Sequence, residues 1–600
     1  MSAPQPTSLP GRSLWLPSAI AACFVYGLLL IALIHTTADG SWFWYAQALT
    51  HGQHLYRELH LAMQPVYPLE LASLQRLLGT TWIAQQSAGL VNLVLFLIAL
   101  WAVTRHNHTS PLQRALLLAC SFLTAIGFIS MRFDDFHILA TSLELLCAAL
   151  LLSLAHRQPS TPRRILALVA IGVLCGLCIL TRLNDGSLLL FAVLVSAVAI
   201  AHGVARHIEA LLTIAGVSAL TLLLVLTCIG ETPRDWWFYS IHTAAAIKGG
   251  AGHLWQYPLR LPVGTVREIT RDWRNVVLTA YALILGAIAV YLTRNRHSLS
   301  TRRRWILVLF ALVLALPLSR NIIRGNAARV LVAFAVFGIY IVGIATLVRL
   351  VRALRGRPAP TWRPIELLML IPAAQLISIS LSAALWYPNP NPPAALFLIL
   401  LPVGAPWAIA RRDARNVFFT WVVLLTISAG IDKLRNPFDW FNYRARSFDA
   451  ERTWYPHPAF GPMLIETAQL RLMLPVCAAV DAAPPSQREL LSLPFTYPNY
   501  FCDIPPWHGY TQTFYDTSSR ATITALGHEL LTAPPEWIVY QRQLDILFRN
   551  EEAFNHGQPL PHRELDTLIM DQLATHRWTA TTLPAPPRDS STWLLIHTRP

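Results

Sequence analysis

The sequence predicts a polytopic α-helical membrane protein of about 13 transmembrane helices, followed by a C-terminal α/β extracytoplasmic domain. Of the 600 residues, 54% are hydrophobic and only 13% are charged, whereas a soluble globular protein has about twice that charged fraction. Apolar runs of about 17–22 residues recur along the first 430 residues, and a helix of this length crosses a hydrocarbon core. No such run follows residue 431.

The first apolar run, residues 14–34, is long for the core of a signal peptide, and no small-residue cleavage site follows it. We therefore expect a retained membrane anchor. The other spans are expected at residues 82–103, 115–130, 136–155, 165–181, 186–201, 208–229, 275–293, 305–318, 328–348, 365–386, 394–410 and 417–431.

The net charge of +15 is carried almost entirely by arginine, much of it in short loops between the spans. Basic loops mark the cytoplasmic side of a membrane protein, so the charge indicates topology and does not require a nucleic-acid partner. Binding of anionic lipids would use the same residues. The basic loops are residues 105–114, 157–164, 202–207, 294–304, 349–363 and 411–415. This assignment places the N-terminus in the cytoplasm and, after an odd number of spans, the C-terminus outside.

The first outer loop, residues 36–81, carries the most distinctive polar sequence of the chain. It begins with Asp39 where the first span leaves the membrane. An aromatic cluster typical of a membrane interface follows at residues 42–45. Further along are Gly52, Tyr56-Arg57-Glu58 and the turn Gln64-Pro65-Val66-Tyr67-Pro68. We expect this loop to border a site at the membrane surface. A second long outer loop is expected at residues 230–274, with His242 and Lys248.

Two short loops place further charges on the same outer face. Asp134 and Asp135 precede the fourth span, and Arg182 lies with Asp185 between the fifth and sixth. Capping of the following helix would also explain Asp39, Asp134 and Asp135. The convergence of acids and a cation on one face instead favours group transfer to a hydroxyl, with an anionic leaving group held by cations.

The loop at residues 319–329 carries Arg320, Arg324 and Arg329 on the outer face, against the positive-inside pattern. Either a span has been miscounted or these arginines face a phosphate, which arginine binds in bidentate fashion.

Residues 432–600 contain short alternating segments at residues 536–540 and 592–597. They predict a soluble α/β domain of about 150 residues on the outer face. Cys477 and Cys502 lie in this part, and their spacing leaves open whether they pair.

These motifs resemble the GT-C class of polytopic glycosyltransferases, close to the bacterial protein-mannosyltransferase-like and aminoarabinose-transferase-like families. The class pattern of an acid, an aromatic helix, a glycine, Tyr-Arg-acid and a proline turn is matched by residues 39–40, 42–45, 52, 56–58 and 64–67. Residues 132–139 resemble the second acidic motif, residues 172–186 the glycine-rich span, and residues 493–506 and 530–540 the C-terminal domain. Gly40 stands where a second acid is common, and the proline pair is broken.

The resemblance implies an inverting transfer of a sugar from a polyprenyl-phosphate donor to a hydroxyl at the outer face of a bacterial inner membrane. Asp39 would be the general base, and Asp134 or Asp135 would orient a substrate or hold a divalent cation. The donor phosphate would be bound by Arg182, Arg320, Arg324, Lys248 and His242. First-loop substrate contacts are expected from Tyr45, Tyr56, Arg57, Gln64 and Tyr67. The acceptor would be a glycan, a lipid or a protein.

Two other function classes remain open. A lipid-linked-sugar transporter or flippase would carry charges within its spans and repeat its halves, whereas here we expect the charges at span ends. A scaffold that binds a lipid-linked sugar without catalysis would be consistent with Gly40, which stands where the class commonly has a second acid.

Overall fold

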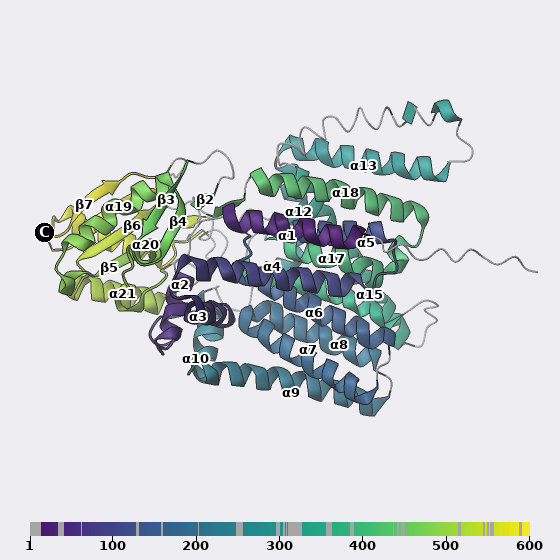
Figure 1. Cartoon of the computed structure of the whole chain (residues 1–600), viewed down its shortest axis with the longest axis horizontal. Coiled ribbons are helices and arrows are strands. Elements are labelled where there is room, and N and C mark those ends of the chain that lie inside the picture. The colour runs from purple at the N-terminus through teal and green to yellow at the C-terminus, as the bar shows by residue number, and fades with distance from the viewer. Residues whose placement is uncertain are drawn as a thin grey trace, which may run out of the picture.

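The computed structural model of the chain describes residues 14–33, 41–61, 63–127, 131–157, 160–201, 203–247, 256–295, 300–303, 306–307, 309, 327–355, 363–383, 389–435, 437–440, 443–445, 451–513, 518–543, 547–548, 551, 557–586 and 591–599. Within these ranges, helices account for the chain up to Arg435 and every strand comes after it. A helical bundle and a C-terminal domain lie end to end (Figure 1).

Ten of the described helical segments are long and apolar enough to cross a membrane. They are α1 (Trp15–Leu33), α4 (Trp82–Thr104), α6 (Phe136–Arg157), α7 (Thr161–Thr181), α8 (Leu183–Ile200), α9 (Val204–Cys228), α13 (Trp273–Arg294), α15 (Ala327–Leu354), η2 (Pro364–Met369) with α16 (Leu370–Ala383), and α18 (Arg412–Arg435). Two shorter apolar helices are α5 (Pro111–Ile126) and α17 (Asn391–Gly404). These helices confirm the expected fold class and coincide with all expected spans except residues 305–318, most of which lie outside the described residues.

Glycines allow two neighbouring helices to pack closely. A Cβ on Gly172 of α7 would lie 2.8 Å from Val217 Cβ, and one on Gly176 would lie 2.8 Å from the Ser218 carbonyl oxygen of α9. Ser218 Oγ also donates a hydrogen bond to the Gly172 carbonyl oxygen at 2.9 Å. Small residues spaced four apart with an interhelical hydrogen bond are a typical membrane helix contact.

The turn between α7 and α8 consists of Arg182 alone, in an extended conformation with φ −155° and ψ 103°. Such a tight antiparallel hairpin brings the two helix backbones together. A Cβ on Gly186 would overlap the backbone of Ile179, so only glycine fits there. This explains why the glycine-rich span ends with a glycine four residues after Arg182.

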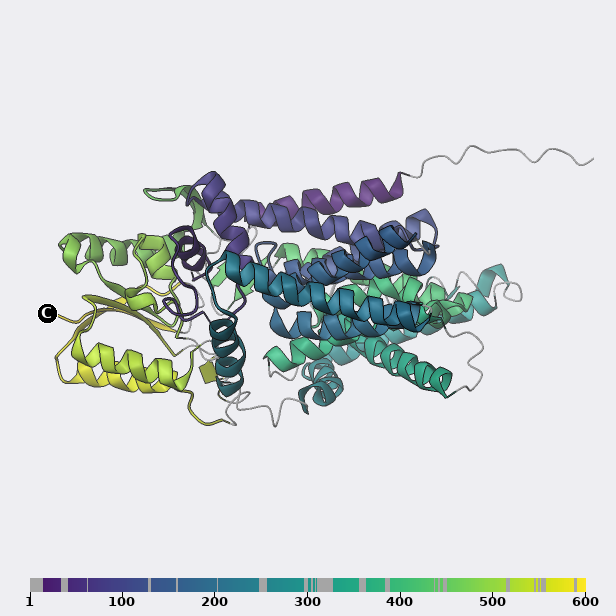
Figure 2. The same cartoon turned by 90° about the horizontal axis from the view of Figure 1, so that it is seen from below.

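Both long loops lie at one end of the bundle, which we call the loop end. The first loop contains α2 (Ser41–Thr50) and α3 (Val66–Leu78). The second contains α10 (Pro233–Trp237), the π-helix η1 (Phe238–Thr243), α11 (Ala244–Ile247) and α12 (Gln256–Thr270). Figures 1 and 2 show that α2, α3, α10 and the C-terminal domain share this end.

The C-terminal domain is built on a four-stranded sheet with the order β5-β6-β8-β7. Its strands are β5 (Leu490–Leu493), β6 (Trp537–Arg542), β7 (Thr579–Leu583) and β8 (Thr592–His597). β5 and β6 are parallel and the other pairs antiparallel, with Leu490 opposite Trp537 and Trp537 opposite His597. The helices are α19 (Thr467–Ala482), α20 (Tyr497–Cys502), α21 (Arg520–Thr532) and α23 (His562–Ala574). This arrangement confirms the predicted α/β class.

Two hairpins precede the sheet, namely β1 (Phe438–Trp440) with β2 (Tyr443–Ala445), and β3 (Arg452–His457) with β4 (Gly461–Glu466). Short turns of 3-10 helix lie at η3 (Pro406–Ile409), η4 (Pro485–Gln487) and η5 (Trp507–Gly509). A disulfide joins Cys477 of α19 to Cys502 of α20, which answers the pairing left open by the sequence.

The C-terminal domain is docked directly on the first loop. Phe43 packs edge-on against Phe460 and Tyr500, with ring centroids 4.9 and 4.6 Å away. The backbone N–H of Trp82 donates to the Phe460 carbonyl oxygen at 3.3 Å. Thr511 Oγ1 lies 2.5 Å from the Tyr45 hydroxyl. Aromatic pairs and hydrogen bonds across this contact fix the geometry of the loop end.

Candidate functional site

An aromatic cluster is centred on Trp42 at the loop end. The Trp42 ring contacts Tyr45, Tyr67 and Phe136 with centroid distances of 5.9, 5.2 and 5.5 Å. These rings come from α2, α3 and the start of α6, so residues far apart in the sequence meet around one indole. Tyr67 then donates a hydrogen bond from its hydroxyl to the Asp134 carbonyl oxygen at 2.8 Å. The first loop is thereby tied to the second acidic motif.

Asp134 lies between a cation and an amide. Arg132 Nε is 3.6 Å from Asp134 Oδ1, and Gln85 Nε2 donates to Oδ2 at 3.4 Å. Burial raises the pKa of the Asp134 carboxyl above its ordinary value, although the Arg132 charge opposes the shift. Such a carboxyl, set beside a cation at a helix junction, is a functional-site candidate.

Asp135 has a different environment and caps a helix. The His137 backbone N–H donates to Asp135 Oδ1 at 2.8 Å, and His137 Nδ1 lies 2.6 Å from the same oxygen. Burial alone would raise the pKa of Asp135, but the charge and hydrogen bonds of His137 outweigh it and lower the pKa. On the other side of this loop, Lys433 Nζ donates to the Met131 carbonyl oxygen at 2.7 Å. The loop of residues 131–135 is therefore held by Lys433 at its start and by His137 at its end. Of its two acids, Asp134 is the one that contacts α4, through Gln85.

Three polar residues near Asp134 were not expected from the sequence, namely Glu70, Gln85 and Asn92. Gln85 and Asn92 lie seven residues apart on one face of α4, within an apolar run where neither stands out. Burial raises the pKa of the Glu70 carboxyl, on α3, to about 7, an effect that the neighbouring Asn92 amide partly offsets. The two amides Gln85 and Asn92, seven residues apart in an apolar run, were the sequence signal that could have predicted a polar face on α4.

Tyr56, Arg57 and Gln64, expected as substrate contacts, hold the second loop against the first. Arg57 pairs with Asp235 at 2.6 Å, and Gln64 Oε1 accepts a hydrogen bond from Trp236 Nε1 at 2.8 Å. Tyr56 is fully buried. Glu231 accepts hydrogen bonds from the backbone N–H groups of Leu55 at 2.6 Å and Tyr56 at 3.4 Å. Burial raises the pKa of this carboxyl.

Arg182 forms an ion pair with Asp185. Its Nη1 lies 2.6 Å from Asp185 Oδ2 in the first turn of α8, and the other Asp185 oxygen accepts a hydrogen bond from Ser378 of α16. Glu144 is buried nearby in α6, with Oε2 unpartnered among the described residues. Glu144 is an exception to the expected clustering of charges at span ends, because it falls in about the third turn of α6.

The remaining predicted residues divide into two groups. His242 is exposed in the second loop and stacks on Phe238 at 5.3 Å. Asp39, Lys248, Arg320 and Arg324 lie outside the described residues. Asp39 precedes Trp42 by three positions in the chain.

The sequence left open a divalent cation at Asp134 and Asp135. Among the described residues, no three His, Cys, Asp or Glu side chains come together in a way that could hold a metal ion. The two carboxylates also face different partners, Gln85 with Arg132 for one and His137 for the other. The described donor set does not fit a metal, so no reaction step is derived through one.

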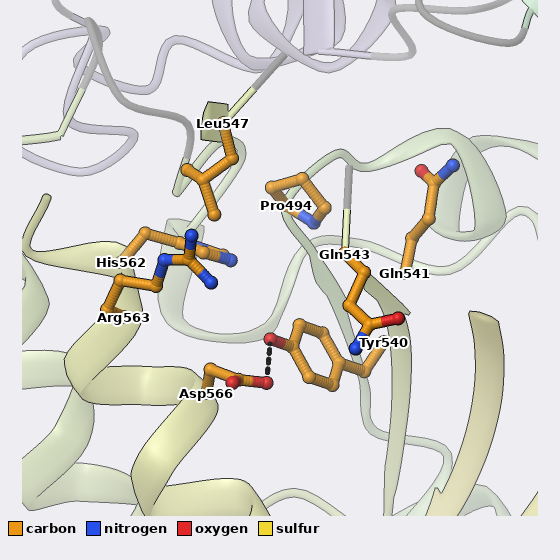
Figure 3. A pocket seen from close by; sticks show the side chains of 8 residues that line it. All are labelled: Pro494, Tyr540, Gln541, Gln543, Leu547, His562, Arg563 and Asp566. Atoms are coloured by element: carbon orange, nitrogen blue, oxygen red, sulfur yellow. Dashed lines mark hydrogen bonds between the residues drawn. The ribbon is translucent and has the colours of Figure 1, made fainter. Parts of the chain in front are cut away.

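The C-terminal domain contains a small pocket of its own at the carboxyl ends of β5 and β6 (Figure 3). Tyr540 donates a hydrogen bond to Asp566 Oδ1 at 2.7 Å, and Arg542 Nε donates to the same oxygen at 2.8 Å. The lining residues are Pro494, Tyr540, Gln541, Gln543, Leu547, His562, Arg563 and Asp566. None of the predicted site residues lines it, so it is separate from the loop-end site.

His562 in this pocket predicts a pH-dependent stability. Burial lowers its pKa to about 4, below the ordinary value of about 6.5. The unfolded chain therefore binds a proton at a pH where the folded chain does not, and stability falls as the pH drops below about 6.5. Between about pH 7.5 and pH 5, we expect a loss of about 2 kcal/mol in the free energy of unfolding. This loss is measured by hydrogen exchange of the backbone N–H groups of β5 and β6 in the full chain at the two pH values.

The control for that prediction is His562→Asn, whose amide can replace the Nδ1 contact with the Thr513 carbonyl oxygen, 3.1 Å in the parent. This variant cannot titrate in the range and should lose most of the pH slope. An unchanged slope in His562→Asn would assign the effect to another group.

Comparison with known proteins gives structural similarities only. No protein-family model and no curated protein sequence matches the chain. The structure is similar to ArnT from Cupriavidus metallidurans bound to undecaprenyl phosphate, with 13% identity, a TM-score of 0.39 and 98% of both chains covered. It is also similar to the archaeal oligosaccharyltransferase AglB from Archaeoglobus fulgidus in complex with an inhibitory peptide and a dolichol-phosphate. There the identity is 11% and the TM-score 0.46, with 95% of this chain and 73% of that chain covered.

Proposed function

We propose that the chain transfers a sugar, with inversion, from a polyprenyl-phosphate donor to a hydroxyl acceptor at the outer face of a bacterial inner membrane. The observation that supports the proposal is the contact between the described part of the first loop and the loop that carries Asp134, at one end of the helical bundle. Tyr67 of the first loop donates a hydrogen bond from its hydroxyl to the carbonyl oxygen of Asp134. Asp39 belongs to the same loop in the sequence, and we propose that it acts at this contact.

The reaction is a single displacement. The acceptor hydroxyl oxygen forms a bond to the anomeric carbon while the bond from that carbon to the phosphate oxygen breaks. The acceptor proton passes to the Asp39 carboxylate, and the bonding electrons leave with polyprenyl phosphate. Asp134, whose pKa is raised by burial, would orient a substrate hydroxyl. Arg182, with Lys248, His242, Arg320 and Arg324, would stabilise the phosphate that leaves.

The distribution of basic loops supports the proposal that the reaction takes place on the outer side of the membrane. The helices that start or end at the loop end have their other ends at the basic loops, for example α4 at Thr104 and α7 at Thr161. Since basic loops stay in the cytoplasm, the loop end and the C-terminal domain would be extracytoplasmic. A disulfide in that domain, between Cys477 and Cys502, fits an oxidising compartment.

The proposal is tested with purified full-length protein in nanodiscs. Undecaprenyl phosphate carrying glucose, mannose, galactose or arabinose is supplied with glycan, lipid and peptide acceptors, and release of undecaprenyl phosphate is followed. We expect acceptor-dependent release with one donor and a product of inverted anomeric configuration by NMR. Retention of configuration would contradict the single displacement.

Proteoliposomes separate the alternatives. Donor placed in one leaflet and then reached by a membrane-impermeant lectin or hydrolase reports movement across the bilayer. Movement without acceptor-dependent release would show a flippase, and tight donor binding without either would show a scaffold. Both results would overturn the proposed transferase.

A further inference from the structure

A group of buried polar side chains lies beside Asp134 between α3 and α4, neighbouring helices at the loop end (Figure 1). Gln85 and Asn92 lie two turns apart on α4, and Gly89 lies between them on the same face. A Cβ on Gly89 would lie 3.5 Å from the Asp134 backbone nitrogen. This face of α4 is therefore turned toward the acidic loop. The Glu70 carboxyl of α3 lies within reach of the Asn92 amide and of the Asp134 charge, but the Asn92 contact does not have the geometry of a hydrogen bond.

Several atoms in this group have no hydrogen-bond partner in the described part of the chain. They are both carboxylate oxygens of Glu70, both amide atoms of Asn92 and Oε1 of Gln85. Asn92 is 0% exposed and Gln85 is 5% exposed. Buried polar groups are normally paired, because an unpaired one loses its hydration without compensation. An apolar α4 would pack at lower cost, so these side chains indicate a polar ligand.

The charges around the group narrow the class of ligand. Arg132, 3.6 Å from Asp134, opposes a bound cation. The Glu70 and Asp134 carboxyls oppose a bound phosphate. A hydroxyl both donates and accepts, as do the two amides, so several hydroxyls on a rigid ring would satisfy the unpaired atoms.

We propose that Glu70, Gln85 and Asn92 form the subsite that binds the sugar ring of the donor, with Asp134 at its edge. This inference rests on the proposed function and assigns the sugar and the lipid phosphate to different parts of the protein. The subsite recognises hydroxyl groups and contributes little to binding of the lipid or its phosphate. Its loss should therefore remove the difference in affinity between sugar-bearing and sugar-free lipid.

The test compares two ligands on full-length protein in nanodiscs, undecaprenyl phosphate and the undecaprenyl-phosphate sugar that the wild type turns over. The variants are Asn92→Leu, which keeps the side-chain size, and Glu70→Gln. For each, we expect affinity for the sugar-bearing donor to fall about tenfold, the order for one or two lost hydrogen bonds. Affinity for undecaprenyl phosphate should change less than about twofold. The Tm of Asn92→Leu without ligand should stay equal or rise, because an unpaired amide is removed.

The matched control is Ser121→Ala on α5. Ser121 Oγ is also buried and unpartnered among the described residues, but it belongs to another helix pair. Affinity for both ligands should be unchanged in this variant.

The outcomes are distinct. An equal fall for both ligands, or a lower Tm in Asn92→Leu, would show that the group only supports the fold, and unchanged donor affinity would overturn the subsite directly. If the wild type binds no sugar-bearing donor better than undecaprenyl phosphate and turns none over, the proposed function fails and the subsite falls with it. If wild type turns donor over while the variants match it, only the subsite fails.

Discussion

Asp39→Asn is expected to lower the rate of sugar transfer by about 10²–10⁴-fold, the usual contribution of a general base. Asparagine is nearly the same size as aspartate but cannot accept the acceptor proton at neutral pH. Donor affinity should stay within a few fold, because the sugar and phosphate are bound elsewhere in the proposed site. Single-turnover release of undecaprenyl phosphate measures the chemical step separately from binding.

Asp39→Ser distinguishes catalysis from helix capping. Asp39 precedes α2 (Ser41–Thr50) by two residues, and serine, asparagine and aspartate all cap helices well. If Asp39 were only a cap, both Asp39→Ser and Asp39→Asn would retain activity. Retained activity would also direct the search for the base to Asp134, since Asp135 already caps α6 through His137.

Gly509→Ala is expected to weaken docking of the C-terminal domain on the first loop, with a cost of about 2–4 kcal/mol. Gly509 has φ 77°, a conformation that a side chain disfavours. A Cβ there would also overlap the backbone carbonyl oxygen of Glu58. Relief of that overlap must move η5 or the first loop, and the adjacent Tyr510–His60 stack at 5.3 Å would open. Hydrogen exchange in residues 41–61 and the Tm of the full chain measure the change.

Gly557→Ala is the matched control for Gly509→Ala. Gly557 has φ 79°, and a Cβ at this position would meet no described atom within 4 Å, so the variant should show the backbone cost of about 1 kcal/mol alone. Transfer activity should fall in Gly509→Ala and not in Gly557→Ala. Equal effects in the two variants would mean that the Glu58 contact is unimportant.

The sequence predicted the features that depend on local pattern. Apolar length located the spans, so α6 and α15 begin within a residue of the expected positions 136 and 328. Alternating residues located β6 and β8. The alternative of capping, which the sequence left open, describes Asp135 in the structure.

Features that depend on tertiary contacts were not predicted. Nothing in the sequence indicates that Glu231 would accept the backbone N–H of Leu55, or that Glu70 would meet Asn92, because the contacts join separate helices. Arg182 was expected at the donor phosphate, and its ion pair with Asp185 depends on the one-residue turn between α7 and α8. The catalytic role of Asp39 remains a prediction.

The hydrogen bond between Tyr45 and Thr511 joins residues 466 positions apart, and it has a consequence in time. A ribosome making about 5–20 residues per second needs about 20 to 90 seconds to cover that distance. Throughout this interval the first loop has been made without the domain that packs against it. The nascent chain would thus pass through biosynthesis inactive, and activity would begin only when the last quarter of the protein arrives.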